Sequence, residues 1–369
     1  IKCMVKKSSF KNLSPLEEEL LQKAPTGQMI GQMVLPDEED ASNRVRADLL
    51  HALLLGEIDD VPLHPKGVRL RGAWIDGDLD FEGCEFSRPV KLFTCRFSGE
   101  VVFLDAHVPA LYLSGSDVAN LILHRLRSDG DVHLRQGFRA QAGVNLGGAQ
   151  ITGSLTCDGG HFENVEGRAL HCNGMTVGAD VFFRDDFKAF GEVNLVGAQI
   201  TGQLDCTGGH FENANGTALR GNAMTVGADV FLRDGFQATG NLNLRRARIT
   251  GNLQIIKAEI NGLVDLQSGR VDEGFFWKNI SGDVTTLDLT DTSVGVLRDD
   301  LESWDAVKRS RLKGFRYDGI DSDIRVRYRI EHLAPTKDQV ATFDPQPHTQ
   351  LAKTLSTHGQ PVGAARVQF

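Results

Sequence analysis

The sequence predicts an all-β solenoid, a right-handed parallel β-helix with coils of about 24 residues. Three observations support this fold class. A 49-residue repeat runs through the middle of the 369-residue chain, apolar residues alternate with polar ones in short bursts, and glycine is abundant at 40 residues. Self-similarity at such a period is typical of repeat architectures. The alternating bursts indicate short β-strands and do not fit the stripe of an amphipathic helix.

The repeat is clearest in three copies of one motif. GVNLGGAQITG at 143–153 returns as EVNLVGAQITG at 192–202 and as NLNLRRARITG at 241–251. Residues 143–191 and 192–240 are identical at 34 of 49 positions, too many for chance. Leu195 and Leu219 hold matching places 24 residues apart, so each 49-residue unit is expected to contain two coils.

The apolar residues of one unit are expected to line the interior, because successive side chains of a strand point to opposite faces. Glycine or asparagine separates the bursts and is expected at the corners, since Gly turns freely into positive φ. Stacking would place Ile151, Ile200 and Ile249 in one interior column. The expected inward residues of the unit are Val193, Leu195, Ile200, Leu204, Cys206, Phe211, Leu219, Met224, Val226, Val230, Leu232 and Phe236.

Apolar residues recur at intervals of nearly five residues, with Ala149 two positions before Ile151 and Ala198 two before Ile200. This spacing resembles that of pentapeptide-repeat proteins. The coils expected here are longer than those of the strict repeat. Segments 67–75 and 343–352, with the Ala-Gln-Ile-Thr-Gly units, are similar to a largely uncharacterised bacterial group of β-helix proteins, often labelled membrane-associated or oxidoreductase. The resemblance covers most of the chain, implies a membrane segment farther downstream, and brings no established activity.

Helical segments are expected at both ends, which gives three regions: an N-terminal cap at 1–66, the β-helix at 67–297, and a mainly helical region at 298–369. Solenoid ends need caps because exposed strand edges recruit other strands. Ser14-Pro15-Leu16-Glu17 predicts a helix start with a capping box, and a second helix is expected from about 38 to 55. Helices are also expected over 323–333 and 347–357, followed by a break at Gly359 and a last helix, as in a tetratricopeptide-like hairpin.

Composition limits the function classes. A net charge of −9 and a pI near 5.7 argue against general nucleic-acid binding, which needs a basic surface. The six cysteines show no CxxC pair, so we expect reduced core residues, Cys157 and Cys206 among them, and a cytoplasmic location, which the resemblance extends to the periphery of the inner membrane. His161 and His210 are expected as turn residues too far apart to share a metal ion. Neither a cofactor nor a metal site is expected.

The strongest candidate binding face follows from alternation in the motif at 229–233. Inward Val230 and Leu232 leave Asp229, Phe231 and Arg233 facing outward. Stacked copies would form a ladder of carboxylate, aromatic ring and guanidinium able to bind a protein partner. The alternative is a set of exposed ion pairs of little energetic weight. The ladder consists of Asp131, His133, Arg135, Asp180, Phe182, Arg184, Asp229, Phe231 and Arg233.

A second candidate is a local basic patch in an acidic chain. It could contact anionic lipid headgroups, or it could be only a solvated surface. Its residues are Lys308, Arg309, Arg311, Arg325, Arg327 and Arg329.

A non-catalytic scaffold or protein-interaction module is therefore the favoured function, with the oligomeric state open. A carbohydrate-active enzyme would need clustered carboxylates and an aromatic groove, and Asp180 or Asp229 could contribute. Near-identical repeats, however, do not build one special site, and no catalytic residue is assigned. The sequence also leaves open an acidic mimic of DNA and a self-polymerising filament.

Overall fold

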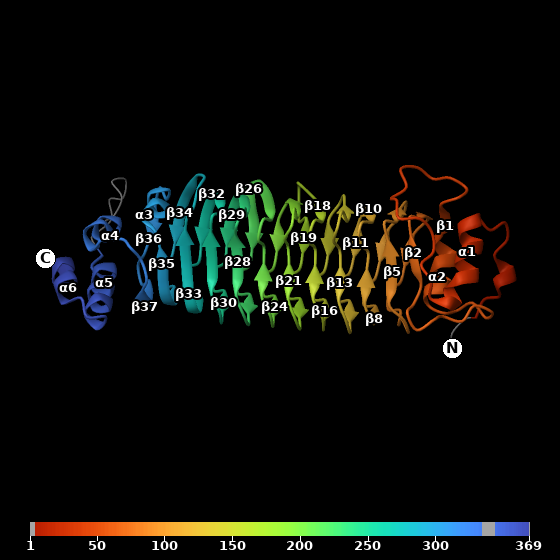
Figure 1. Ribbon diagram of the computed structural model, residues 1–369, viewed down its shortest axis with the longest axis horizontal. Helices are drawn as coiled ribbons and strands as arrows, with labels where there is room; N and C mark the ends of the chain where they lie inside the picture. Colours follow the sequence, from red (N-terminus) through yellow and green to blue (C-terminus); the bar gives the residue numbers. More distant parts are fainter. Residues whose placement is uncertain (1–3, 334–343, 369) are drawn as a thin grey trace. The chain divides into compact units, whose positions relative to one another are not determined.

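The computed structural model describes residues 4–333 and 344–368 and is a parallel β-solenoid of about 11 turns with short helices at both termini (Figure 1). The predicted fold class is confirmed. The chain divides into two compact units, Ile1–Gly191 and Glu192–Phe369. In each unit the strands pair in parallel and belong to two sheets.

The first unit begins with helical segments η1 (Lys7–Ser9), α1 (Pro15–Lys23), η2 (Ala24–Thr26) and α2 (Ala47–Leu54). Its strands are β1 Arg44–Arg46, β2 Arg69–Arg71, β3 Trp74–Asp76, β4 Leu79–Asp80, β5 Val90–Phe93, β6 Arg96–Phe97, β7 Val101–Val102, β8 His107–Val108, β9 Leu111–Tyr112, β10 Asp117–Val118, β11 Leu121–Ile122, β12 Arg127–Ser128, β13 Val132–His133, β14 Arg139–Ala140, β15 Val144–Asn145, β16 Gln150–Ile151, β17 Leu155–Thr156, β18 His161–Glu163, β19 Leu170–His171, β20 Thr176–Val177, β21 Val181–Phe182 and β22 Lys188–Phe190.

The second unit ends with helices α3 (Leu301–Asp305), α4 (Val326–Leu333), α5 (Gln346–Thr357) and α6 (Pro361–Gln368). Its strands are β23 Val193–Asn194, β24 Gln199–Ile200, β25 Leu204–Asp205, β26 His210–Arg220, β27 Thr225–Val226, β28 Val230–Arg233, β29 Gln237–Asn243, β30 Arg248–Ile249, β31 Leu253–Ile256, β32 Glu259–Asp265, β33 Arg270–Lys278, β34 Val284–Asp288, β35 Ser293–Asp299, β36 Ser310–Arg311 and β37 Arg316–Ile320.

Coil length alternates and is not a uniform 24 residues. In the second unit Leu204 pairs with Val230, 26 positions later, Val230 with Leu253, 23 later, and Leu253 with Phe275, 22 later. The 49-residue repeat is therefore one coil of 26 and one of 23. The longer coil contains an extra loop after Glu212, where the pairing of β26 shifts register.

The interior is built as the repeat predicts. Ile200 pairs with Val226, which pairs with Ile249 and then Val271, and all four are at most 2 % exposed. In the first unit Ile151 pairs with Val177 in the same way. All twelve residues expected to point inward are buried. Burial of a large apolar side chain stabilises a fold by about 1.5–3 kcal/mol, so this repeated column carries much of the stability.

The corners of the coils are not restricted to glycine or asparagine, as the sequence had suggested. Glycine occupies some of them in positive φ, such as Gly148 at 64° and Gly197 at 65°, but charged and polar residues also adopt this conformation. Arg125 has φ 53° and Gln136 has φ 54°. The stacked hydrogen bonds on either side hold these corners in the left-handed region, which non-glycine residues otherwise disfavour.

The N-terminal cap seals the first strand edge. Ser14 and Glu17 form the predicted capping box of α1, and the same side chains bind β1: Ser14 Oγ donates to Arg44 O at 2.6 Å, and the Arg46 N–H donates to Glu17 Oε1 at 2.9 Å. The second helix was expected from residue 38 but begins at Ala47, because Val45 pairs with Ile75 in the sheet. Sheet pairing therefore overrides the helical spacing there.

The solenoid extends past residue 297, where the predicted β-helix ended. β35 pairs with β37, so one more coil follows before the helices. Helix α5 covers the edge of β37: Gln350 Nε2 donates to Tyr317 O at 2.8 Å, while Gln346 accepts from Gly314 N–H at 2.9 Å and donates to Phe315 O at 3.2 Å. One outer strand at each end, β1 at the N-terminal end and β37 at the C-terminal end, is thus hydrogen-bonded by side chains of the terminal helices.

Candidate interaction faces

Three residues of the predicted ladder, His133, Phe182 and Phe231, lie in outward rows of the two units. In the first unit Tyr112, His133, Thr156 and Phe182 follow one another in register on β9, β13, β17 and β21, and we call them the first row. In the second unit Phe231, Gln254, Phe276 and Arg298 do so on β28, β31, β33 and β35, and we call them the second row. The sequence prediction missed Tyr112 and Phe276, which stand outside the 49-residue repeat.

The aspartates of the ladder support the backbone. Asp131 Oδ1 accepts a hydrogen bond from Ser154 N–H at 2.9 Å, and Asp229 Oδ1 accepts one from Asn252 N–H at 2.7 Å. Each carboxylate therefore bonds to the next coil, a charge-assisted contact that ties neighbouring turns together. Asp180 occupies the equivalent position before β21. These hydrogen bonds between coils explain why an aspartate recurs at this position of the repeat.

The arginines lie over the rings. Arg184 stacks on Phe182 and Arg233 on Phe231, each guanidinium carbon 4.1 Å from the ring centroid. Asp158 accepts from Arg184 Nη2 at 2.9 Å. These contacts hold each ring and its cation in one arrangement, which lowers the entropy lost when a partner binds.

The second row repeats this arrangement farther along. Arg298 lies over Phe276 at 4.9 Å and pairs with Asp321 at 3.2 Å, while Arg233 Nη1 donates to Gln254 Oε1 at 2.8 Å. Both rings are half-buried, so part of each remains available to a partner. Rings and cations therefore run along one face of the second unit.

His133 is the predicted ladder residue that differs most from its copies. Tyr112 packs edge-on against it with ring centroids 4.7 Å apart. Burial lowers the pKa of His133, and the neighbouring Arg135 charge lowers it further. The imidazole is therefore neutral near pH 7, and the first row is aromatic rather than cationic at this position. Among the described residues, the Nε of Arg135 has no hydrogen-bond partner.

Three of the six residues of the predicted basic patch pair with carboxylates. Lys308 pairs with Asp283 at 2.6 Å and Arg311 with Asp288 at 3.1 Å. Arg329 is buried and forms two 2.8 Å hydrogen bonds to Asp299. Arg327 lies over the Tyr328 ring at 4.4 Å, and no side-chain partner is described for Arg309 or Arg325. Pairing with carboxylates lowers the positive potential that a lipid surface would need.

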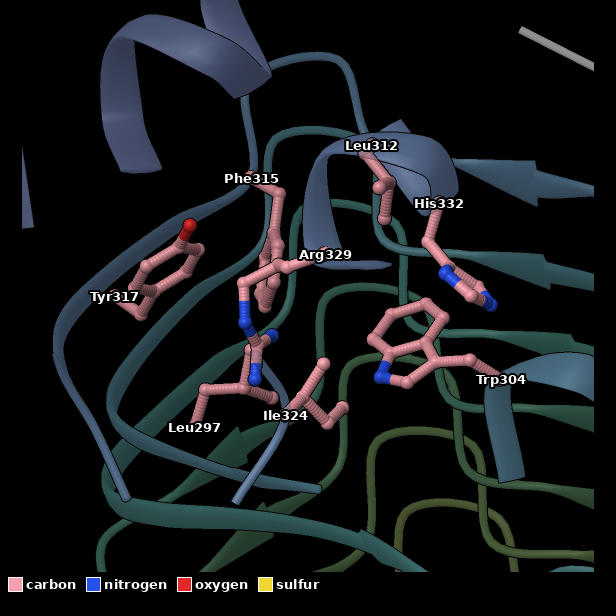
Figure 2. A pocket seen from close by; sticks show the side chains of 8 residues that line it. All are labelled: Leu297, Trp304, Leu312, Phe315, Tyr317, Ile324, Arg329 and His332. Carbon is pink, nitrogen blue, oxygen red and sulfur yellow. The ribbon is translucent and has the colours of Figure 1, made fainter. Parts of the chain in front are cut away.

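A small cavity lies beside that buried ion pair in the second unit. Figure 2 shows Arg329 extending from α4 among Leu297, Ile324 and Trp304. Its volume is about 20 Å³, enough for a single water molecule, so it is a packing cavity. Trp304 Nε1 also donates to Asp299 at 2.7 Å, and burial raises the pKa of Tyr317 nearby. The cluster attaches α4 to the last coils.

The remaining candidates from the sequence are structural. Cys157 and Cys206 are fully buried, as predicted, and burial raises the pKa of both thiols. His161 and His210 lie on β18 and β26 and hydrogen-bond to Glu163 and Glu212, so they are strand rather than turn residues. Within residues 4–333 and 344–368 no group of His, Cys, Asp or Glu is arranged to hold a metal ion.

The described helices include none that is long and apolar enough to cross a membrane. The resemblance to pentapeptide-repeat and membrane-associated bacterial β-helix proteins remains a prediction. No family model, curated protein or solved structure was found to match this chain.

Proposed function

We propose that the chain is a non-catalytic scaffold that binds a protein partner through the aromatic face of its solenoid. The observation that carries this proposal is the second row, where Arg233 and Arg298 lie over Phe231 and Phe276. Aromatic residues and arginine are enriched at the energetic centres of protein interfaces. The rings are fixed in register by the sheet, so they present a pre-ordered surface.

The sealed ends support a lateral binding mode. Ser14 and Glu17 cover the edge of β1, and Gln346 and Gln350 cover that of β37. A filament built end to end would need these backbone groups free. The covered strands therefore favour recognition through the lateral faces.

The enzymatic alternative gains no support from the aspartates. A glycosidase needs two carboxylates on either side of the scissile bond, one of them able to protonate the leaving group. Asp131 and Asp229 instead accept backbone hydrogen bonds from the next coil. The aromatic rows could stack on sugars, but Asp158 beside Phe182 is bound by Arg184.

The DNA-mimic alternative needs a continuous negative face. The second row contains Arg298, and another outward row of the same unit mixes neutral, acidic and basic residues: Asn194, Arg220, Asn243, Asp265, Asp288 and Arg311. Of that row, Arg220 pairs with Glu192 at 2.7 Å and Arg311 with Asp288 at 3.1 Å. The arginines interrupt any continuous negative face, which weighs against mimicry of a phosphate backbone.

The test compares how tightly wild type and variants bind a purified partner protein. Proteins cross-linked to the chain in cells are identified and purified, and their affinities for wild type and for Phe231→Ser/Phe276→Ser are measured by calorimetry. Each lost ring at the centre of an interface costs about 2 kcal/mol or more, so affinity should fall by at least tenfold. The matched control is Glu259→Gln/Ser281→Ala on the other sheet. Unchanged affinity in the serine variant, or an equal loss in the control, would refute this face.

A further inference from the structure

The third copy of the repeat breaks the pattern with arginine. The first two copies carry small or neutral residues at three outward positions, and the third carries a cation at each. A special site should interrupt a repeat, because identical coils present identical surfaces. The replaced residues are Gly147 and Val196 by Arg245, Gly148 and Gly197 by Arg246, and Gln150 and Gln199 by Arg248.

Two of these arginines weaken the fold. Arg246 has φ 58° at a corner where Gly197 has φ 65°, a conformation that costs a side-chain-bearing residue energy. Arg248 on β30 pairs in register with Arg270 on β33, and like charges directly opposite each other are destabilising. Strands β30 and β33 are labelled in Figure 1. Such unfavourable choices concentrate at functional positions.

Two of the three arginines, Arg245 and Arg246, line a surface groove. Its volume is about 370 Å³, large enough for a small anionic ligand or for the charged group of a larger one. The groove lies on the second unit only, and small side chains form much of its wall. It is lined by Val196, Asn222, Ala223, Arg245, Arg246, Gln267 and Ser268.

Among the described residues, Arg245 and Arg270 are paired with carboxylates, whereas Arg246 and Arg248 are not. Arg245 is held by Asp265 at 3.2 Å and by the side chain of Gln267, and Arg270 is held by Asp272 at 2.5 Å. Within the described part of the chain, the guanidinium groups of Arg246 and Arg248 have neither a hydrogen bond nor an ion pair. Both residues are exposed. Two cations are therefore fixed by carboxylates, and two are free beside them.

We propose that this cluster binds a tetrahedral oxyanion, the phosphate or sulfate group of a ligand. Arg245 and Arg246 line the groove in which the ligand lies, and Arg246 supplies an unpaired charge there. Arg248, two residues after Arg246 on β30, supplies the second unpaired charge. Guanidinium groups bind such oxyanions through paired charge-assisted hydrogen bonds. The side chain of Asn222 also lines the groove, which suits a ligand with a hydroxyl group beside its charge.

The test restores the second copy of the repeat. Arg246→Gly/Arg248→Gln gives the corner and strand the residues present at 197 and 199 and leaves the Arg245 pair intact. Arg139→Gln/Arg325→Gln removes the same number of charges elsewhere and is the matched control. Calorimetric titration with inorganic pyrophosphate and with a sulfated disaccharide, at low and at physiological salt, distinguishes the two sources of oxyanion.

Wild type and control should bind at least one of the two probes saturably at one site, and the Gly/Gln variant at least tenfold more weakly. Binding of pyrophosphate alone assigns a phosphate ligand, and binding of the disaccharide alone assigns a sulfate ligand. A thermal scan without ligand verifies that the variant is folded. Saturable binding of neither probe, equal binding by the variant, or an equal loss in the control would overturn the proposal. The aromatic rows are untouched by these substitutions, so the outcome is independent of the proposed scaffold function.

Discussion

The buried ion pair between Asp299 and Arg329 gives the sharpest energetic prediction. Asp299 has no exposed side-chain surface and Arg329 is 9 % exposed, and two 2.8 Å hydrogen bonds join them. Arg329→Met leaves the carboxylate buried with Trp304 as its remaining side-chain donor. Removal of one partner from a buried pair costs about 3–5 kcal/mol. At about 1.4 kcal/mol per factor of ten, local opening of α4 should rise a hundredfold or more.

Removal of both charges should cost less. In Asp299→Leu/Arg329→Met no buried charge remains, and the main loss is the acceptor for the Trp304 N–H. An unsatisfied buried donor costs about 1–3 kcal/mol. The double variant should therefore be more stable than Arg329→Met alone, and the two substitutions should be strongly coupled.

Native-state hydrogen exchange of the α4 amides measures local opening directly. Arg327→Met on the same helix is the control, because Arg327 is exposed, and its described side-chain contacts are with the ring and the hydroxyl of its neighbour Tyr328. It should change exchange by less than about 1 kcal/mol. If Arg329→Met and Arg327→Met have equal effects, or if the double variant is the least stable of the three, the reasoning about this ion pair is wrong.

Three further predictions concern the solenoid. Gly197→Ala should cost about 1 kcal/mol of unfolding free energy, because φ is 65° there but an added Cβ meets no atom within 4 Å. Gly227→Ala should cost more, because its Cβ would lie 2.2 Å from a carbonyl oxygen. Urea denaturation measures both costs, and equal costs would contradict this reasoning. Burial alone would raise the pKa of Glu17, but hydrogen bonds from its partners lower the pKa overall. The stability that Glu17→Gln removes should therefore be present at pH 7 and decrease as pH falls below the ordinary value of 4.5. A stability difference that does not shrink as the pH is lowered would argue against this linkage. Burial lowers the pKa of His133, and the charge of Arg135 lowers it further. The folded state therefore binds fewer protons than the unfolded state and loses stability as pH falls below about 6.5. Arg135→Ala should raise the pKa of His133 in an NMR titration, and an unchanged pKa would rule out the charge effect.

The sequence by itself determined the solenoid and its interior. Every coil must bury the same positions against its neighbours, so a 49-residue repeat with alternating apolar bursts allows few other folds. Ile200 and Ile249 could therefore be assigned to one column from their spacing alone. The Ser14–Glu17 capping box could also be predicted, because it depends on residues three apart in one helix.

The outward rows could be predicted only where the repeat continues. Phe182 and Phe231 recur at the repeat interval, whereas Tyr112 and Phe276 lie in irregular coils and became members of a row only through strand register. The roles of the aspartates were also hidden. A carboxylate that bonds to the next coil and one that faces a ligand have the same alternation in sequence.

Tertiary structure alone decided the ends and the ion pairs. Val45 lies in a segment with helical spacing, yet it pairs with Ile75 because an open sheet edge gains more from a strand than from another helical turn. Arg329 was predicted to belong to a solvated basic patch, yet it lies buried on Asp299, 30 positions earlier. The local sequence determines which secondary structure a segment can form. Which carboxylate pairs with a buried arginine depends instead on distant segments that come together only when the coils have stacked. For this reason the repeating interior was predictable and its single-copy contacts were not.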